Sequence, residues 1–150
     1  MKKIFTAAFL LLFSHVLFAQ IQNPVSWMAT SKKISDKTYE IHLTANINKG
    51  WHIYSQTTPD GGPVATNLTF TKNPLLILDG KTKELGKLEQ RHEELFGVDV
   101  KQFSNQIDFV QVVKLKAPVK TSVDVAVEFM VCNDKQCLPP TTKKFTVALK

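Results

Sequence analysis

The stretch VDVAVEFMVC, residues 123–132, decides the fold because its side chains alternate strictly. Its odd positions are four valines and a phenylalanine, whereas its even positions include Asp124 and Glu128. A period of two places the two sets of side chains on opposite faces of a β-strand. We therefore predict a strand with one buried face, and Cys132, at the end of this strand, falls on the less buried face.

The same alternation recurs along the chain and indicates β structure almost throughout. From Tyr39 to Ile47 every odd position is apolar, which is typical of a half-buried strand. Further short strands are predicted at residues 51–56, 68–71, 107–115 and 145–149, with Pro, Gly and Asn clusters between them. Only residues 85–95 have a helical composition, and this segment is too short and too interrupted by Gly86 to change the class. Several short strands at this spacing predict an all-β sandwich.

The N-terminus has the pattern of an export signal. Lys2 and Lys3 precede an apolar run from Ile4 to Phe18, which is followed by Ala19. This run is shorter than the roughly 20 residues that a spanning helix needs. We expect residues 1–19 to be a cleaved signal peptide, with no permanent membrane anchor, and residues 20–150 to form one domain.

Composition restricts the function classes. The formal net charge of +6 is spread over many lysines without a dense basic run, so nucleic-acid binding has little support. Cys132 and Cys137 are the only cysteines. In an exported, oxidising compartment such a pair persists as a disulfide or is kept reduced by a dedicated electron supply.

Spacing alone leaves two roles open for the cysteine pair. A loop with four intervening residues can bring two Cα atoms within the roughly 4.4–6.8 Å that a disulfide requires. A structural staple is one role, although so short a loop constrains the unfolded chain by only about 2 kcal/mol. Redox chemistry is the other, and composition and spacing alone favour the staple.

No other residues form a convincing catalytic or metal site. His42, His52 and His92 lack a ligand-type spacing, so we expect solvated histidines and neither metal nor other cofactor. Glu93 and Glu94 have the composition of a charged loop. The large aromatic side chains are expected in the core of a sandwich; they are Trp27, Trp51 and Phe70.

Three segments resemble a known family, and together they extend over nearly all of the chain that follows the predicted signal. VCNDKQCLPPT, residues 131–141, resembles the active-site hairpin of the N-terminal periplasmic domain of the thiol:disulfide interchange protein DsbD. GWHIYSQ, residues 50–56, resembles an early aromatic strand of that domain. EELFG, Glu93 to Gly97, resembles the acidic and aromatic loop that caps its cysteines.

The resemblance implies an immunoglobulin-like β-sandwich that exchanges thiols and disulfides with periplasmic partners. It implies that Cys137 forms the intermolecular bond and that Cys132 resolves it. It also implies that a cap loop shields the cysteines and opens when a partner docks; its residues are Glu94, Leu95, Phe96 and Gly97.

This sequence differs from the family pattern at three places. Leu95 occupies the position of the capping phenylalanine, with Phe96 next to it. His52 occupies an aromatic position of the early strand, beside Tyr54, and both are expected near the cysteines. Because the chain ends at Lys150, we expect its electrons to come from separate proteins.

The leading hypothesis is a periplasmic component of a protein-disulfide reductase system. Its expected partners are thioredoxin-fold proteins and a membrane electron carrier. One alternative is a non-catalytic binding or adaptor module in which the disulfide is a staple. A second is an accessory to cytochrome c maturation. The sequence carries no prediction of oligomeric state.

Overall fold

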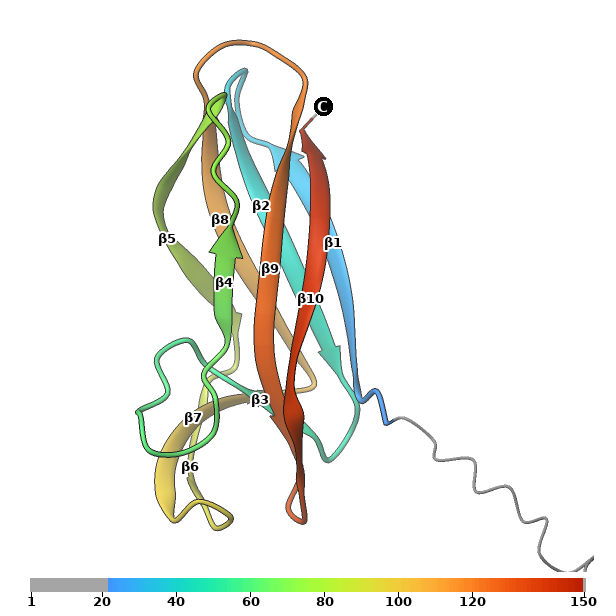
Figure 1. The fold of residues 1–150 in the computed structure, drawn as a ribbon, viewed down its shortest axis with the longest axis vertical. Helices are drawn as coiled ribbons and strands as arrows, with labels where there is room; N and C mark the ends of the chain where they lie inside the picture. Colours follow the sequence, from blue (N-terminus) through green and yellow to red (C-terminus); the bar gives the residue numbers. More distant parts are fainter. Residues whose placement is uncertain (1–21, 150) are drawn as a thin grey trace, which may run out of the picture.

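The computed structural model describes residues 22–149, which form two packed β-sheets (Figure 1). The predicted all-β sandwich is confirmed. The ten strands are β1 (Val25–Lys33), β2 (Thr38–Ile47), β3 (His52–Tyr54), β4 (Asn67–Phe70), β5 (Leu76–Gly86), β6 (Glu89–Glu93), β7 (Val98–Ser104), β8 (Gln106–Leu115), β9 (Thr121–Cys132) and β10 (Cys137–Leu149). The predicted signal peptide lies outside the described residues. Residues 22–149 contain no helix long and apolar enough to cross a membrane.

The two sheets differ in size, and β9 organises the larger one. The four-stranded sheet has the order β1-β2-β8-β5, and the six-stranded sheet has the order β10-β9-β3-β7-β6, with β4 also paired to β9. Strand β3 pairs with the end of β9, where His52 lies opposite Cys132. Strand β4 pairs with its middle, where Leu68 lies opposite Val127. The long strand β9 therefore connects the centre of the sandwich to the cysteines at its end.

The main core lies between the sheets and follows the predicted alternation. Ile41 and Leu43 on β2 and Val127 on β9 are buried, each separated from the next buried residue by a more exposed one. The indole of Trp27 packs against Phe129, with ring centroids 5.1 Å apart. Partly buried aromatic side chains complete this core as expected; they are Trp27, Trp51 and Phe70.

The region between residues 76 and 104 was not predicted in detail. Strand β5 is exposed along most of its length, so its side chains do not alternate clearly between buried and exposed. It is held instead by backbone pairing with β8, with a register shift between Asp79 and Lys83. No helix forms over residues 85–95, which belong to β5, β6 and the turn after β6. Pairing with β8 and β7 thus outweighs the local composition of this segment.

A second, smaller cluster covers the outer face of the large sheet near the cysteines. Ile53 on β3 points into the main core, so its neighbours His52 and Tyr54 point to the opposite face. There Tyr54 packs with Val100 on β7 and with Cys132. This cluster, rather than the main core, surrounds the cysteine pair.

Candidate redox site

The cysteines close a tight hairpin between β9 and β10. Cys132 and Cys137 are directly opposed in the strand pairing and form a disulfide, with their Cα atoms 4.0 Å apart. The side-chain oxygen of Asn133 accepts hydrogen bonds from the backbone N–H groups of Lys135 and Gln136, both at 2.9 Å. An asparagine side chain that bonds to the backbone in this way is typical of turns. Asn133 therefore fixes the loop that brings the two sulfur atoms together.

The prolines after Cys137 interrupt the pairing of β10. The register between β9 and β10 shifts between Leu138 and Thr141, across Pro139 and Pro140. Proline has no N–H group to donate to a strand ladder and is found at bulges. Regular pairing resumes at Thr141, so the cysteine turn is separated from the rest of β10 by a bulge.

Cys132 is fully buried, although it lies at the end of the less buried face of β9. Its face of β9 was predicted correctly, since Val131 enters the main core and Cys132 points the other way. Tyr54 and Val100 cover that face at the end of the strand. The covering side chains come from β3 and β7, so the alternation within β9 gives no sign of them. Cys137, by contrast, is only partly buried.

A buried polar cluster lies against the disulfide. The Tyr54 hydroxyl donates a hydrogen bond of 2.9 Å to Glu93 Oε2. His52 Nε2 lies 3.1 Å from the same carboxylate oxygen and 3.1 Å from the Tyr54 hydroxyl. The structure therefore brings together three residues that the sequence predicted near the cysteines. All three are buried: His52 is 3% exposed, Tyr54 0% and Glu93 4%.

Burial sets the protonation of this cluster. It lowers the pKa of His52 from the usual 6.5, and the hydrogen bond and charge of Glu93 oppose that shift. Burial also raises the pKa of Tyr54 well above 10, with Glu93 adding to the effect, so the phenol stays protonated. The expectations of a solvated His52 and of a loop position for Glu93 were wrong, because Glu93 ends β6 and both side chains are covered by the sheet.

The other two histidines within residues 22–149 lie outside this cluster. His92 is exposed and pairs with Asp99 at 2.9 Å, which raises its pKa. His42 and Asp108 are both on the four-stranded sheet, with His42 Nδ1 2.7 Å from the Asp108 carboxylate. Within residues 22–149, no three potential ligands come close enough to hold a metal ion.

The residues expected in the cap form the turn between β6 and β7. The backbone N–H groups of Phe96 and Gly97 both donate to the carbonyl oxygen of Glu93, and Gly97 has φ of 66°. Glu94 lies within this turn. Leu95 is 47% exposed and Phe96 37% exposed, whereas the side chains packed around Cys132 come from the strands. The turn thus presents two apolar side chains to solvent near the cysteine end of the sandwich.

An ion pair that the sequence did not predict joins β6 to the cysteine turn. Arg91 lies 3.0 Å from the carboxylate of Asp134, and both side chains are substantially exposed. These residues are 43 positions apart in the chain, on β6 and in the turn between β9 and β10. No sequence pattern connects them.

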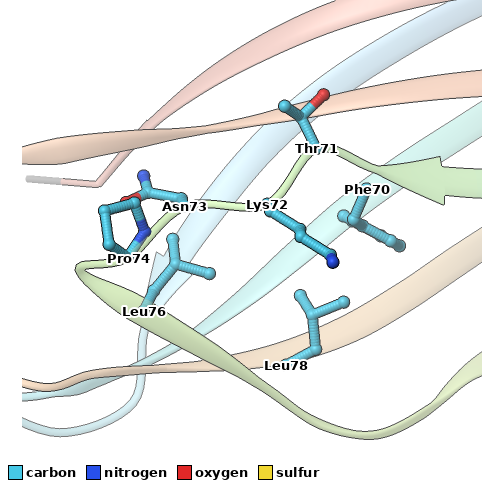
Figure 2. Close-up of a pocket in the computed structure, with 7 residues that line it drawn as sticks. All are labelled: Phe70, Thr71, Lys72, Asn73, Pro74, Leu76 and Leu78. Carbon is cyan, nitrogen blue, oxygen red and sulfur yellow. The ribbon is translucent and has the colours of Figure 1, made fainter.

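An apolar cavity lies away from the cysteines. It has a volume of about 460 Å³ and opens between the end of β4 and the start of β5. Figure 2 shows Phe70, Leu76 and Leu78 around it, with Lys72 alongside. The β4–β5 connection is at the top of Figure 1, whereas the β9–β10 turn is at the bottom. This cavity is therefore no part of the disulfide site.

Fold and site together define a class: an immunoglobulin-like β-sandwich with a disulfide across one terminal hairpin and a buried polar cluster beside it. The family model described as "Thiol:disulfide interchange protein DsbD, N-terminal" matches residues 22–149. The chain belongs to this family, and the resemblance found in the sequence is confirmed.

Solved structures support the fold. The N-terminal domain of DsbD from Neisseria meningitidis in the reduced form is 14% identical, with a TM-score of 0.50 over 81% of this chain and 84% of that chain. The same organism's complex between the DsbD and PilB N-terminal domains matches at 14% identity and a TM-score of 0.51, over 85% and 87%. The N-terminal periplasmic domain of ScsB from Proteus mirabilis matches at 15% identity and a TM-score of 0.54, over 83% of this chain and 44% of that chain. A search of curated protein sequences finds no match.

Proposed function

We propose that this protein relays reducing equivalents between exported proteins by thiol–disulfide exchange at Cys132 and Cys137. The observation that carries the proposal is a disulfide across a turn, between a fully buried and a partly buried cysteine, in a chain of the DsbD N-terminal family. Exchange needs one sulfur that a partner reaches and a second that resolves the mixed disulfide. The pair meets both requirements within one hairpin.

The two cysteines are assigned different roles by their accessibility. Cys137 is partly buried and is the sulfur that a partner reaches, whereas Cys132 has no exposed surface and resolves the intermediate. In the reducing direction, the Cys137 thiolate attacks the partner disulfide and releases one partner thiolate. The Cys132 thiolate then attacks Cys137 Sγ and releases the second partner thiolate. Two electrons pass to the partner, and this protein is left with its own disulfide.

The turn from Glu93 to Gly97, together with His52 and Tyr54, is proposed to control access to the pair. Leu95 and Phe96 are exposed apolar side chains on a turn whose first residue, Glu93, bonds to the cluster beside Cys132. A partner that covers them gains apolar contacts next to the disulfide. This arrangement favours reaction with a docked partner over reaction with small oxidants.

The expected partners are thioredoxin-fold proteins, with a membrane electron carrier as the source of electrons. The DsbD domain of Neisseria meningitidis forms a complex with the N-terminal domain of PilB, which supports a protein partner for this chain too. The related ScsB domain is periplasmic. With the predicted signal peptide at residues 1–19, this supports a periplasmic location.

Trapping tests the proposed roles directly. Cys132→Ser removes the resolving thiol, so Cys137 is expected to accumulate in mixed disulfides with partners of the thioredoxin fold when the protein is exported. Non-reducing gels and mass spectrometry of the adducts measure this. Cys137→Ser is the matched control and is expected to trap little, because the remaining thiol is buried. Equal trapping by both variants, or none by Cys132→Ser, would contradict the assignment.

One observation favours a second candidate, a binding module with a structural disulfide. The complete burial of Cys132 is typical of an inert, structural sulfur. In that case the pair resists reduction by the thiols of its compartment, and partner binding does not depend on it. The reduction potential of the pair separates the two functions.

A further inference from the structure

His52 is the titratable side chain placed next to the buried cysteine by strand pairing. It lies directly opposite Cys132 in the pairing of β3 with β9, on the same face of the sheet. Directly opposed residues have Cβ atoms about 4.5–5.5 Å apart. His52 is 3% exposed and Cys132 is 0% exposed, so bulk water is largely excluded from both. Any proton that Cys132 gains or loses is exchanged most readily with groups inside this cluster.

The hydrogen bonds of the cluster assign the proton of the imidazole. Tyr54 donates to Glu93 Oε2, and that oxygen also lies 3.1 Å from His52 Nε2. A carboxylate oxygen that accepts from Tyr54 accepts from Nε2–H as well, so Nε2 carries the hydrogen. The other ring nitrogen, Nδ1, takes part in none of these bonds. In the neutral imidazole Nδ1 is therefore the site that accepts a proton.

Groups on every neighbouring element act on this imidazole. Glu93 on β6 and Asp134 in the cysteine turn raise the pKa of His52, whereas burial and Arg91 lower it, and burial is the largest effect. Tyr54 stays protonated. Strand β7 faces the cluster with residues that do not titrate, which are Val100, Gln102 and Ser104. The imidazole is thus neutral near pH 7 and available as a base.

We propose that His52 accepts the thiol proton of Cys132 when Cys132 resolves a mixed disulfide. This step rests on the proposed function. The S–H bond of Cys132 breaks, its proton passes to His52 Nδ1, and the thiolate attacks Cys137 Sγ. The bond between Cys137 and the partner sulfur breaks, and the partner leaves as a thiolate with the electron pair. The proton then leaves the imidazolium for that thiolate or for water.

Burial explains why such a base is needed. Cys132 has no exposed surface, so bulk water is poorly placed to take its proton. An imidazolium formed beside Glu93 is stabilised by the carboxylate at 3.1 Å. In the reverse direction the same imidazolium returns the proton to Cys132 as it leaves the disulfide.

The two sulfur steps can be separated with Ellman's reagent, an aromatic disulfide. Attack by Cys137 releases one aromatic thiolate, and resolution by Cys132 releases a second from the mixed disulfide. For the reduced mature protein in a stopped-flow instrument, we expect His52→Asn to slow the second release about tenfold or more near pH 7. The first release should change less than about twofold. The pH profile of the second release should become that of a buried thiol alone.

Two further variants complete the test. His92→Asn, at an exposed histidine on β6 that lies outside the cluster, should leave both releases unchanged. Glu93→Gln removes the charge that raises the pKa of His52, so the inflection of the second release should move to lower pH. Because Asn at position 52 can impair folding, thermal unfolding is measured first. If that variant does not fold, two measurements decide the outcome. One is the pH profile of the second release in the wild type, which should inflect below pH 6.5, and the other is the shift of that inflection in Glu93→Gln.

The outcomes separate this inference from the function on which it rests. A second release with unchanged rate and pH profile in folded His52→Asn would overturn the role of His52 and leave the exchange function intact. A wild-type profile without an inflection below pH 6.5 would also overturn it. A wild-type protein that releases no second thiolate at any pH would overturn the exchange function itself.

Discussion

At the scale of single residues, Cys132 and Cys137 differ in their surroundings although one short turn joins them. Cys132 is enclosed by Tyr54 and Val100, and Cys137 keeps some exposed surface. The sequence predicted the pair, its hairpin and the face of β9 on which Cys132 lies. It did not predict the burial, because residues that cover Cys132 are about 30 and 80 positions away in the chain.

His52 gives a prediction about stability and pH. Its pKa in the folded protein is below 6.5, so on acidification the unfolded chain binds the proton first. Stability is therefore lost as the pH falls below about 6.5, until the folded form is protonated as well. Comparing urea unfolding at pH 7.5 and 5.5, we expect His52→Asn to lose less stability than the wild type. Equal losses would contradict a buried, neutral imidazole.

His92 is the matched control for that measurement because its shift has the opposite sign. Its pKa is raised by Asp99, so the folded form binds the proton first. The stability that protonated His92 contributes is present below about pH 6.5 and is lost as the pH rises through the raised pKa. We expect His92→Asn to lose somewhat more stability on acidification than the wild type. A change in the same direction as His52→Asn would show that the effect is not specific to burial.

At the scale of elements, the sequence predicted no strand at β1 or at β5 to β7. In β5, six of the seven residues after Leu76 are exposed, so buried and exposed side chains do not alternate along this part of the strand. Strand β9 was predicted almost to its ends because one of its faces meets the main core along its whole length. Alternating apolar and polar residues indicate a strand with one buried face. A strand that is held mainly by backbone pairing does not show this alternation in its sequence.

Gly86 tests how closely β5 approaches the core. A Cβ atom added there would lie 2.9 Å from Ile107 Cδ1, 3.2 Å from the backbone oxygen of Gln106 and 3.3 Å from Phe103 Cδ1. We expect Gly86→Ala to lower the free energy of unfolding by about 1–3 kcal/mol, because buried neighbours must move. Chemical denaturation measures the change. The control is Leu85→Ala at the adjacent, 55% exposed position, which should change stability by less than about 0.5 kcal/mol. Equal effects of both variants would contradict the close approach.

At the scale of the whole molecule, the disulfide lies at one end of the sandwich. Strand β9 runs from the core to Cys132, and β6 and β7 curve beside the cysteine turn (Figure 1). The sequence predicted this class of fold and the cysteine pair. The association of His52, Tyr54 and Glu93 into one buried cluster needed the structure, because it joins β3 to β6, two strands that are not paired with each other and lie about 40 positions apart in the chain.

The reduction potential of the Cys132–Cys137 pair tests the central claim most directly. The mature protein is equilibrated in thiol buffers of known potential, and its free thiols are counted by mass spectrometry. A relay must exchange electrons with other disulfides, so we expect a value above about −270 mV, in the range of exchange proteins. A value below about −300 mV is that of a structural disulfide and would contradict the account.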